Sequence, residues 1–221
     1  MIKLSRILSY LYPVRIEITR SPVNPVLEVV LSMGKYALHS ENTNYSHGTL
    51  HALFKKIFKK ISLDWNDIND VLILGFGTGS IAEIINEYKK TCLITGVEID
   101  SKIIELGFKY FYFQKLKNTE IICSPADEYV KTCIKKFDLV IIDVFIDIKV
   151  PDELETNEFM EQVKNSMKKN GLVIFNKVTY TREFKKQIPD LRSLYNNVFG
   201  NVELLTIMKT GKIFVSRKND N

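Results

Sequence analysis

Residues 71–80 read Val71-Leu72-Ile73-Leu74-Gly75-Phe76-Gly77-Thr78-Gly79-Ser80, an apolar run followed by three alternating glycines. The apolar run is typical of a strand that is buried on both faces of a parallel sheet. Glycine permits positive φ and lets main-chain amides approach a ligand, and a helix that starts at Ser80 would offer free N–H groups. The stretch therefore predicts a strand, a ligand-binding loop and a helix. Its spacing is GxGxG. It does not match the dinucleotide fingerprint GxGxxG, which needs glycine or alanine where Ser80 stands.

An acid follows at the end of the next expected strand. Glu98 lies 21 positions after Gly77, in the segment Ile94–Asp100. An acid about 20 residues beyond the loop, at the carboxyl end of the second strand, is placed to accept hydrogen bonds from both ribose hydroxyls of a nucleoside. We predict this role for Glu98, with Asp100 as the second choice. The alternative is a tight turn beside a surface acid.

The rest of the chain after Trp65 alternates between strand-like and helix-like segments. The expected strands are 70–74, 92–98, 120–123, 139–143, 172–176, 202–208 and 213–216, and the expected helices are 80–88, 102–113, 125–134, 152–168 and 182–195. Strands that alternate with helices of this length indicate an α/β fold with a mainly parallel, doubly wound sheet of seven strands. Only four residues separate the last two strands, too few for a parallel crossover, so they are expected to form an antiparallel hairpin.

The segment before this fold has a different pattern. Residues 15–38 alternate in hydrophobicity between turn residues and predict a small β-meander. An amphipathic helix is expected over 49–61, and its lysines, together with those at 164–169 and 185–186, are interpreted as solvated faces rather than a nucleic-acid surface. We predict two parts, 1–62 for the meander and connecting helix and 63–221 for the nucleotide-binding domain.

Composition agrees with one sizeable domain and a small appendage. The chain has 221 residues, 45% of them hydrophobic and 26% charged, and a formal net charge of +5. Its three cysteines show neither a disulfide framework nor metal-ligand spacing, so no metal site is predicted. No apolar run is long enough for a membrane-spanning helix and no cleavage pattern follows the N-terminus, which favours a cytoplasmic protein without a membrane partner.

Three motifs together resemble a known group. Gly75–Gly79, Val97–Asp100 and Phe137–Asp143 are similar to the S-adenosylmethionine-binding, Rossmann-like fold of class I methyltransferases, and most similar to its spermidine synthase branch. The resemblance covers about residues 30–178. It implies a β-strand domain before the nucleotide-binding fold, decarboxylated S-adenosylmethionine as the donor, aminopropyl transfer to putrescine, and an aspartate that helps to accept the amine proton. Asp143 occupies that aspartate's position.

The departures from the family pattern lie on both sides of the expected site. Thr78 stands where the family usually has Asp, and Ser124-Pro125-Ala126 replaces a Gly-Asp-Gly or Ala-Asp-Ala motif. Ser124 with Pro125 and Asp127 also reads as a helix N-cap. The strand-four motif, usually Asp-Ser-Thr-Asp-Pro, is here Asp143–Asp147 with an apolar middle, and the family's Tyr-His-Glu appears as Tyr45-Ser46-His47. Several carboxylates expected for a diamine are therefore absent.

These motifs define the predicted site residues. The donor-binding set is Gly75, Gly77, Thr78, Gly79, Glu98, Ile99, Ser124 and Asp143. The predicted catalytic residues are Asp143, which accepts a proton or orients the acceptor, and Tyr45 and His47, which close over the acceptor. A neutral histidine can act as a base near neutral pH. The acceptor is expected to be a small molecule such as an amine, and the resemblance also implies a homodimer.

Four functions remain open on the sequence alone. Methyl transfer from S-adenosylmethionine to a small molecule leads, because the loop and ribose acid are generic to that chemistry and the set of diamine-binding acids is incomplete. Aminopropyl transfer from decarboxylated S-adenosylmethionine is the alternative. A binding or scaffolding protein without turnover is the second alternative, and modification of nucleic acid is the least favoured.

Overall fold

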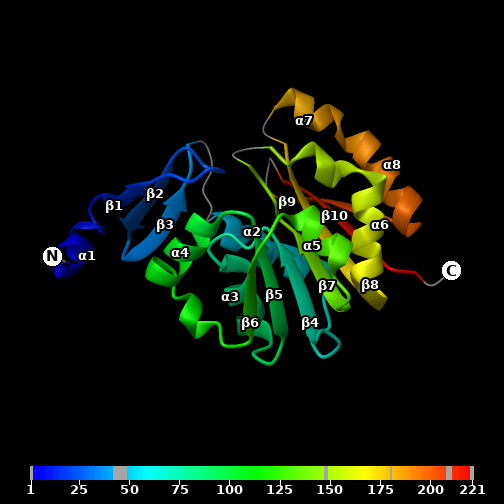
Figure 1. Cartoon of the computed structure of the whole chain (residues 1–221), viewed down its shortest axis with the longest axis horizontal. Helices are drawn as coiled ribbons and strands as arrows, with labels where there is room; N and C mark the ends of the chain where they lie inside the picture. The colour runs from blue at the N-terminus through cyan, green and yellow to red at the C-terminus, as the bar shows by residue number, and fades with distance from the viewer. Residues whose placement is uncertain (1, 42–48, 147–148, 180, 208–210, 220–221) are drawn as a thin grey trace.

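The chain forms two β-sheets of different size (Figure 1). The computed structural model describes residues 2–41, 49–146, 149–179, 181–207 and 211–219. The small sheet is antiparallel and contains β1 (Val14–Thr19), β2 (Leu27–Ser32) and β3 (Lys35–His39) in that order. The large sheet has seven strands in the order β6-β5-β4-β7-β8-β10-β9. Both the predicted α/β class and the small N-terminal β region are confirmed.

The large sheet is parallel except at one end. Its strands are β4 (Asp70–Leu74), β5 (Leu93–Glu98), β6 (Thr119–Cys123), β7 (Phe137–Ile142), β8 (Met167–Val178), β9 (Glu203–Ile207) and β10 (Gly211–Arg217). The first five strands pair in parallel, whereas β10 runs antiparallel to both β8 and β9. The predicted antiparallel hairpin at the end of a parallel sheet is thus present.

Helices cover both faces of this sheet (Figure 1). The longer ones are α2 (Thr49–Ile61), α3 (Ser80–Tyr88), α4 (Ser101–Tyr110), α5 (Ala126–Thr132), α6 (Asn157–Ser166) and α8 (Ile188–Phe199). Because side chains alternate along a strand, Val71 and Ile73 of β4 pack into the core that α2, α3 and α4 share. Leu72 and Leu74 point to the core formed with α5, α6 and α8. The continuous apolar run of β4 reflects this burial on both faces.

Several element boundaries differ from the sequence prediction. The helix expected over 152–168 is divided into the 3-10 turn η2 (Asp152–Glu155) and α6, because the Thr156 side chain caps a new helix by accepting from Phe159 N. The last residues of that range already belong to β8. The helix expected over 182–195 is divided into α7 (Arg182–Lys186) and α8, where Pro189 sits in the first turn.

Further differences lie at α4 and at the N-terminus. α4 ends at Tyr110, before the predicted Phe113, and after it Tyr112 takes a positive φ of 59° ahead of the short turn η1 (Phe113–Lys115). The sequence analysis assigned no helix to the first residues, yet α1 (Ile2–Leu8) forms there.

The small sheet packs on the same core as α2, α3 and α4. Leu27, Val29 and Leu38 of the small sheet are fully buried in that cluster together with Phe54 and Ile57 of α2. The meander therefore does not stand alone, since its apolar face is covered by the core of the larger fold. The division of the chain at residue 62 remains a prediction.

Candidate active site

The glycine loop and the end of β7 touch through their backbones. Gly75 has a φ of +83°, and a Cβ built on it would lie 2.3 Å from the carbonyl oxygen of Asp143. Any other residue would clash with main chain here, so glycine is required for both conformation and space. The Asp143 N–H also donates to the Leu74 carbonyl at 2.8 Å. The predicted donor loop and the predicted catalytic aspartate are therefore held together at the carboxyl ends of β4 and β7.

Glu98 closes the loop from the neighbouring strand. Its Oε2 accepts from Gly77 N at 2.8 Å and its Oε1 accepts from Asp100 N at 3.0 Å. Each carboxylate oxygen can accept a second hydrogen bond, so the geometry leaves capacity for a diol. Burial raises the pKa of Glu98 to about 7, against the lowering effect of these two amides. The structure thus brings Gly77 and Glu98 together, as the spacing predicted.

Asp100, the second choice for a ribose acid, has its carboxylate occupied elsewhere. Its Oδ1 accepts from Lys102 N and caps α4. Its Oδ2 accepts from Ser21 Oγ and Asn24 Nδ2, which belong to the turn between β1 and β2. Glu98 is therefore the acid that contacts the glycine loop.

Asp143 has a side-chain partner that the sequence analysis missed. Asn176, near the end of β8, donates from Nδ2 to Asp143 Oδ1 at 2.8 Å. Asn176 is 2% exposed, and its Oδ1 has no hydrogen-bond partner among the described residues. Burial raises the pKa of Asp143 to about 6, while the Asn176 hydrogen bond lowers it. The sequence pattern that could have indicated Asn176 is a single polar residue at the end of the apolar run Leu172–Phe175.

The residue after Asn176 makes a second unforeseen contact. Lys177, whose side chain is 2% exposed, forms an ion pair with Glu155 at the end of η2. The Lys177 ammonium also lies 5.6 Å from the centre of the Phe184 ring. The segment between β7 and α6 is therefore fastened at Asp143 and again at Glu155 to two consecutive residues of β8.

The structure places three of the remaining predicted site residues, whereas two others lie outside the described residues. Thr78 is buried in the loop and Ile99 is partly exposed after Glu98. Ser124 N donates to the Glu98 carbonyl at 3.0 Å, which places Ser124 beside Glu98. The predicted N-cap role of Ser124 is wrong, because Pro125 takes the cap position and Ser124 Oγ donates to the Pro125 carbonyl instead. Tyr45 and His47 lie outside the described residues.

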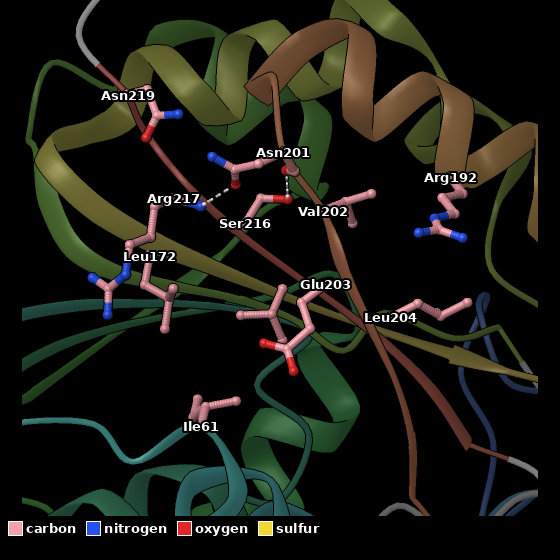
Figure 2. A pocket seen from close by; sticks show the side chains of 11 residues that line it. Ile61, Leu172, Arg192, Asn201, Val202, Glu203, Leu204, Ser216, Arg217 and Asn219 are labelled. Carbon is pink, nitrogen blue, oxygen red and sulfur yellow. Dashed lines mark hydrogen bonds between the residues drawn. The ribbon is translucent and has the colours of Figure 1, made fainter.

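A cavity of about 660 Å³ lies at the other end of the large sheet (Figure 2). Its lining residues include Leu172, Val202, Glu203 and Arg217. Leu172 pairs with Arg217 and lies level with the start of β4, whereas the glycine loop follows the end of β4. Among the predicted donor and acceptor residues that the structure describes, none lines it. This cavity is separate from the candidate site.

A sequence model described as the Spermine/spermidine synthase domain matches residues 52–210, most of the chain. This chain belongs to the spermine/spermidine synthase family. The match includes the glycine loop, Glu98, Asp143 and Asn176, so every described group of the candidate site apart from the turn at Ser21 and Asn24 falls inside the family domain.

Two curated relatives of this spermine/spermidine synthase family member are named as aminopropyltransferases. A polyamine aminopropyltransferase of Vibrio vulnificus is 26% identical over 132 residues, which cover 58% of this chain and 44% of that protein. A probable polyamine aminopropyl transferase of Bifidobacterium longum is 29% identical over 142 residues, 64% of this chain and 31% of that protein. The chain thus spans less than half the length of these two relatives.

Solved structures support the fold. A spermidine synthase in complex with the transition state analogue AdoDATO superposes with a TM-score of 0.75 and 16% identity, over 94% of this chain and 74% of that one. Human methyltransferase-like protein 13 in complex with SAH gives a TM-score of 0.65 and 18% identity, over 79% and 84% of the two chains. The spermidine synthase likeness extends over the small N-terminal sheet.

Several lysines of the runs that the sequence interpreted as solvated faces make contacts within the fold. Lys55 pairs with Glu87, Lys164 donates to the Val198 carbonyl, and Lys168 pairs with Asp70 and Asp138. These lysines are therefore part of the packing of the fold.

In the described part of the chain, no helix has both the length and the apolar character needed to cross a bilayer.

Proposed function

We propose that the chain is an aminopropyltransferase that moves the aminopropyl group of decarboxylated S-adenosylmethionine to a small amine. The observation that carries this proposal is the buried Asp143, which lies against the glycine loop and presents a carboxylate with a raised pKa beside the amide of Asn176. Membership of the spermine/spermidine synthase family and the names of the relatives favour aminopropyl transfer over methyl transfer, which the sequence alone ranked first.

The residues of the loop and of β5 fit a nucleoside donor. Glu98 has spare acceptor capacity on both oxygens for a ribose diol, and Gly75, which has no side chain, lets the loop lie directly against the main chain of Asp143. The bound donor supplies a sulfonium group, which makes the adjacent carbon open to attack. The protein's part is to align the two substrates, exclude water and accept one proton.

The reaction on the acceptor side requires one base. The neutral acceptor nitrogen forms a bond to the carbon of the aminopropyl group that is attached to sulphur. The bond from that carbon to sulphur breaks, and 5′-methylthioadenosine leaves. The new ammonium nitrogen then loses one proton. Asp143 is the group we assign to accept it, since a carboxylate with a pKa of about 6 is ionised at neutral pH yet more basic than an ordinary aspartate. The Asn176 Oδ1 provides an acceptor for an N–H of the same amine.

Other parts of the assignment follow from the family and remain part of this proposal. Tyr45 and His47 are assigned to the acceptor side, and Thr78, Ile99 and Ser124 to the donor side. A homodimer and a division of the chain into 1–62 and 63–221 complete the proposal.

The test is to incubate purified protein with decarboxylated S-adenosylmethionine and a panel of amines and to identify the nucleoside product by mass spectrometry. We expect 5′-methylthioadenosine together with an amine that is heavier by one aminopropyl group. Formation of S-adenosylhomocysteine from S-adenosylmethionine would instead restore methyl transfer. Binding of both donors without product from either would favour a protein that holds a nucleoside without turnover.

A further inference from the structure

The turn between β1 and β2 reaches across to the end of β5. Ser21 Oγ donates to Asp100 Oδ2 at 2.5 Å, and Asn24 Nδ2 donates to the same oxygen at 2.7 Å. Asn24 is 3% exposed and Asp100 is 2% exposed. Ser21 Oγ also accepts from the main-chain N–H groups of Val23 and Asn24, which fixes the turn itself. A small polar cluster is thus buried between the two sheets.

The groups that donate hydrogen bonds in this cluster are neutral. Asp100 Oδ2 receives the two side-chain hydrogen bonds from the turn, and Oδ1 receives the main-chain N–H of Lys102. A buried carboxylate needs such donors, because loss of hydration otherwise disfavours its charged form. The turn at Ser21 and Asn24 therefore supplies two of the three hydrogen bonds that hold this carboxylate in place.

Asp100 is in turn linked to Glu98. The Asp100 N–H donates to Glu98 Oε1 at 3.0 Å, and Glu98 Oε2 accepts from Gly77 N at 2.8 Å. A rotation of the backbone at Asp100 would withdraw one of the two amides that orient the Glu98 carboxylate. The contacts run without interruption from the small sheet through Asp100 to Glu98 and the glycine loop.

We propose that Asn24 and Ser21 are positioning residues for Glu98, so that the small sheet contributes to nucleoside binding and not only to the acceptor side. The proposal rests on the proposed function in one respect, the placement of a ribose at Glu98. It differs from a purely structural role for Asp100 as the cap of α4. A lost cap lowers stability, whereas a displaced Glu98 weakens the ribose contact specifically.

The experiment measures, by calorimetry, the affinity of the full chain for 5′-methylthioadenosine and for its 2′,3′-dideoxy analogue. We expect Asn24→Ala to weaken binding of 5′-methylthioadenosine about fivefold to tenfold, the equivalent of about one hydrogen bond. Binding of the dideoxy analogue, which has no ribose hydroxyl for Glu98, should change by less than about twofold. Ser21→Ala removes one donor from an incompletely buried side chain and serves as a milder second variant.

The matched control is Glu17→Gln. Glu17 also joins the small sheet to α4, through Lys109 and Tyr110, but it makes no contact with Asp100. This control should leave both affinities within about twofold of wild type. Equal losses for the two ligands in Asn24→Ala and Ser21→Ala, or no loss for either, would overturn the positioning role. Failure of the wild-type protein to bind 5′-methylthioadenosine at all would instead overturn the proposed function, and the positioning role with it.

Discussion

Two halves of the candidate site are built from different kinds of contact. The proposed donor half is the glycine loop with Glu98, and the proposed acceptor half is Asp143 with Asn176 and the segment after β7. In the donor half, main-chain N–H groups of Gly77 and Asp100 hold the carboxylate of Glu98. In the acceptor half, the side chain of Asn176 holds the carboxylate of Asp143. The main-chain contacts need only a glycine loop and an acid at the right spacing. The side-chain contact needs two strands to meet in one register, which the local sequence does not encode.

The comparison extends to the electrostatics. Burial raises the pKa of both acids, to about 7 for Glu98 and to about 6 for Asp143. Glu98 is close to a second acid, Asp100, whose charge contributes to its shift. Asp143 has an amide neighbour instead. The two acids therefore share a raised pKa and differ in their neighbours, which are main-chain amides and a second acid at Glu98 and one side-chain amide at Asp143.

The largest effect is expected for the acceptor acid. Asp143→Asn removes the proton acceptor but keeps an oxygen for the Asn176 amide, so the transfer rate should fall about 1000-fold, within the usual range for general bases. Steady-state kinetics with the best amine will measure it, with calorimetry expected to show donor affinity within about fivefold. Asp152→Asn, at an exposed acid of the same segment, is the control. A tenfold effect or less would show that Asp143 only orients the amine.

The donor acid should affect binding more than turnover. Glu98→Gln keeps the shape of the side chain but replaces a charged acceptor, and donor affinity should fall about 30-fold. The dissociation constant from calorimetry, together with KM and kcat, tests this. Glu105→Gln, on the exposed face of α4, should leave all three values unchanged. A loss in kcat with unchanged affinity would place Glu98 on the acceptor half and remove the contrast between the halves.

The buried ion pair of the acceptor half provides a third test. Lys177→Met leaves Glu155 without its partner and should lower the free energy of unfolding by about 2 kcal/mol. The double variant Lys177→Met/Glu155→Leu should recover most of that loss. Lys102→Met breaks the solvated pair with Glu105 and should cost about 0.5 kcal/mol or less. Urea denaturation measures all four proteins, and equal losses for the buried and solvated pairs would contradict the prediction.

The last test concerns the dependence of stability on pH. Because the folded pKa values of Glu98 and Asp143 lie above their ordinary values, the folded state binds extra protons between about pH 4 and 7. Their contribution to stability is complete below about pH 4 and is lost as the pH rises through about 6 for Asp143 and 7 for Glu98. The loss is about 1 kcal/mol per pH unit for each acid where it applies. Thermal melts of wild type and Glu98→Gln/Asp143→Asn between pH 5 and 8 measure it, and parallel curves would contradict it.

The sequence predicted the sheet and the donor half because both depend on local patterns. The apolar run before Gly75, the spacing from Gly77 to Glu98 and the short connection before β10 each have few structural solutions. The interruption near Thr156 was missed because helical periodicity continues on both sides of it. Pro125 became a cap rather than a first helical residue, which sequence preferences alone do not separate.

The acceptor half was only partly accessible from the sequence. Asp143 was identified through the resemblance of Phe137–Asp143 to the family motif, but its partner lies 33 residues away on β8. Lys177 and Glu155 were not foreseen, since nothing in the order of the residues indicates that a lysine in a strand is buried. Asn24 lies in the predicted β-meander, and the sequence analysis assigned it no contact with the nucleotide-binding domain. Such long-range side-chain pairs depend on register, and register is fixed by the whole sheet.

The two attachments of the segment after β7 also have a consequence for how acceptor preference can diverge. Asp143 and Glu155 are secured to neighbouring positions of one strand, Asn176 and Lys177, so the two ends of the segment between them share a common base. Lengthening a flexible loop is inexpensive, at about 0.6 kcal/mol for each doubling. The exposed positions of this segment can therefore change in related or engineered chains while its two attached ends and its buried residues Val150 and Leu154 stay in place.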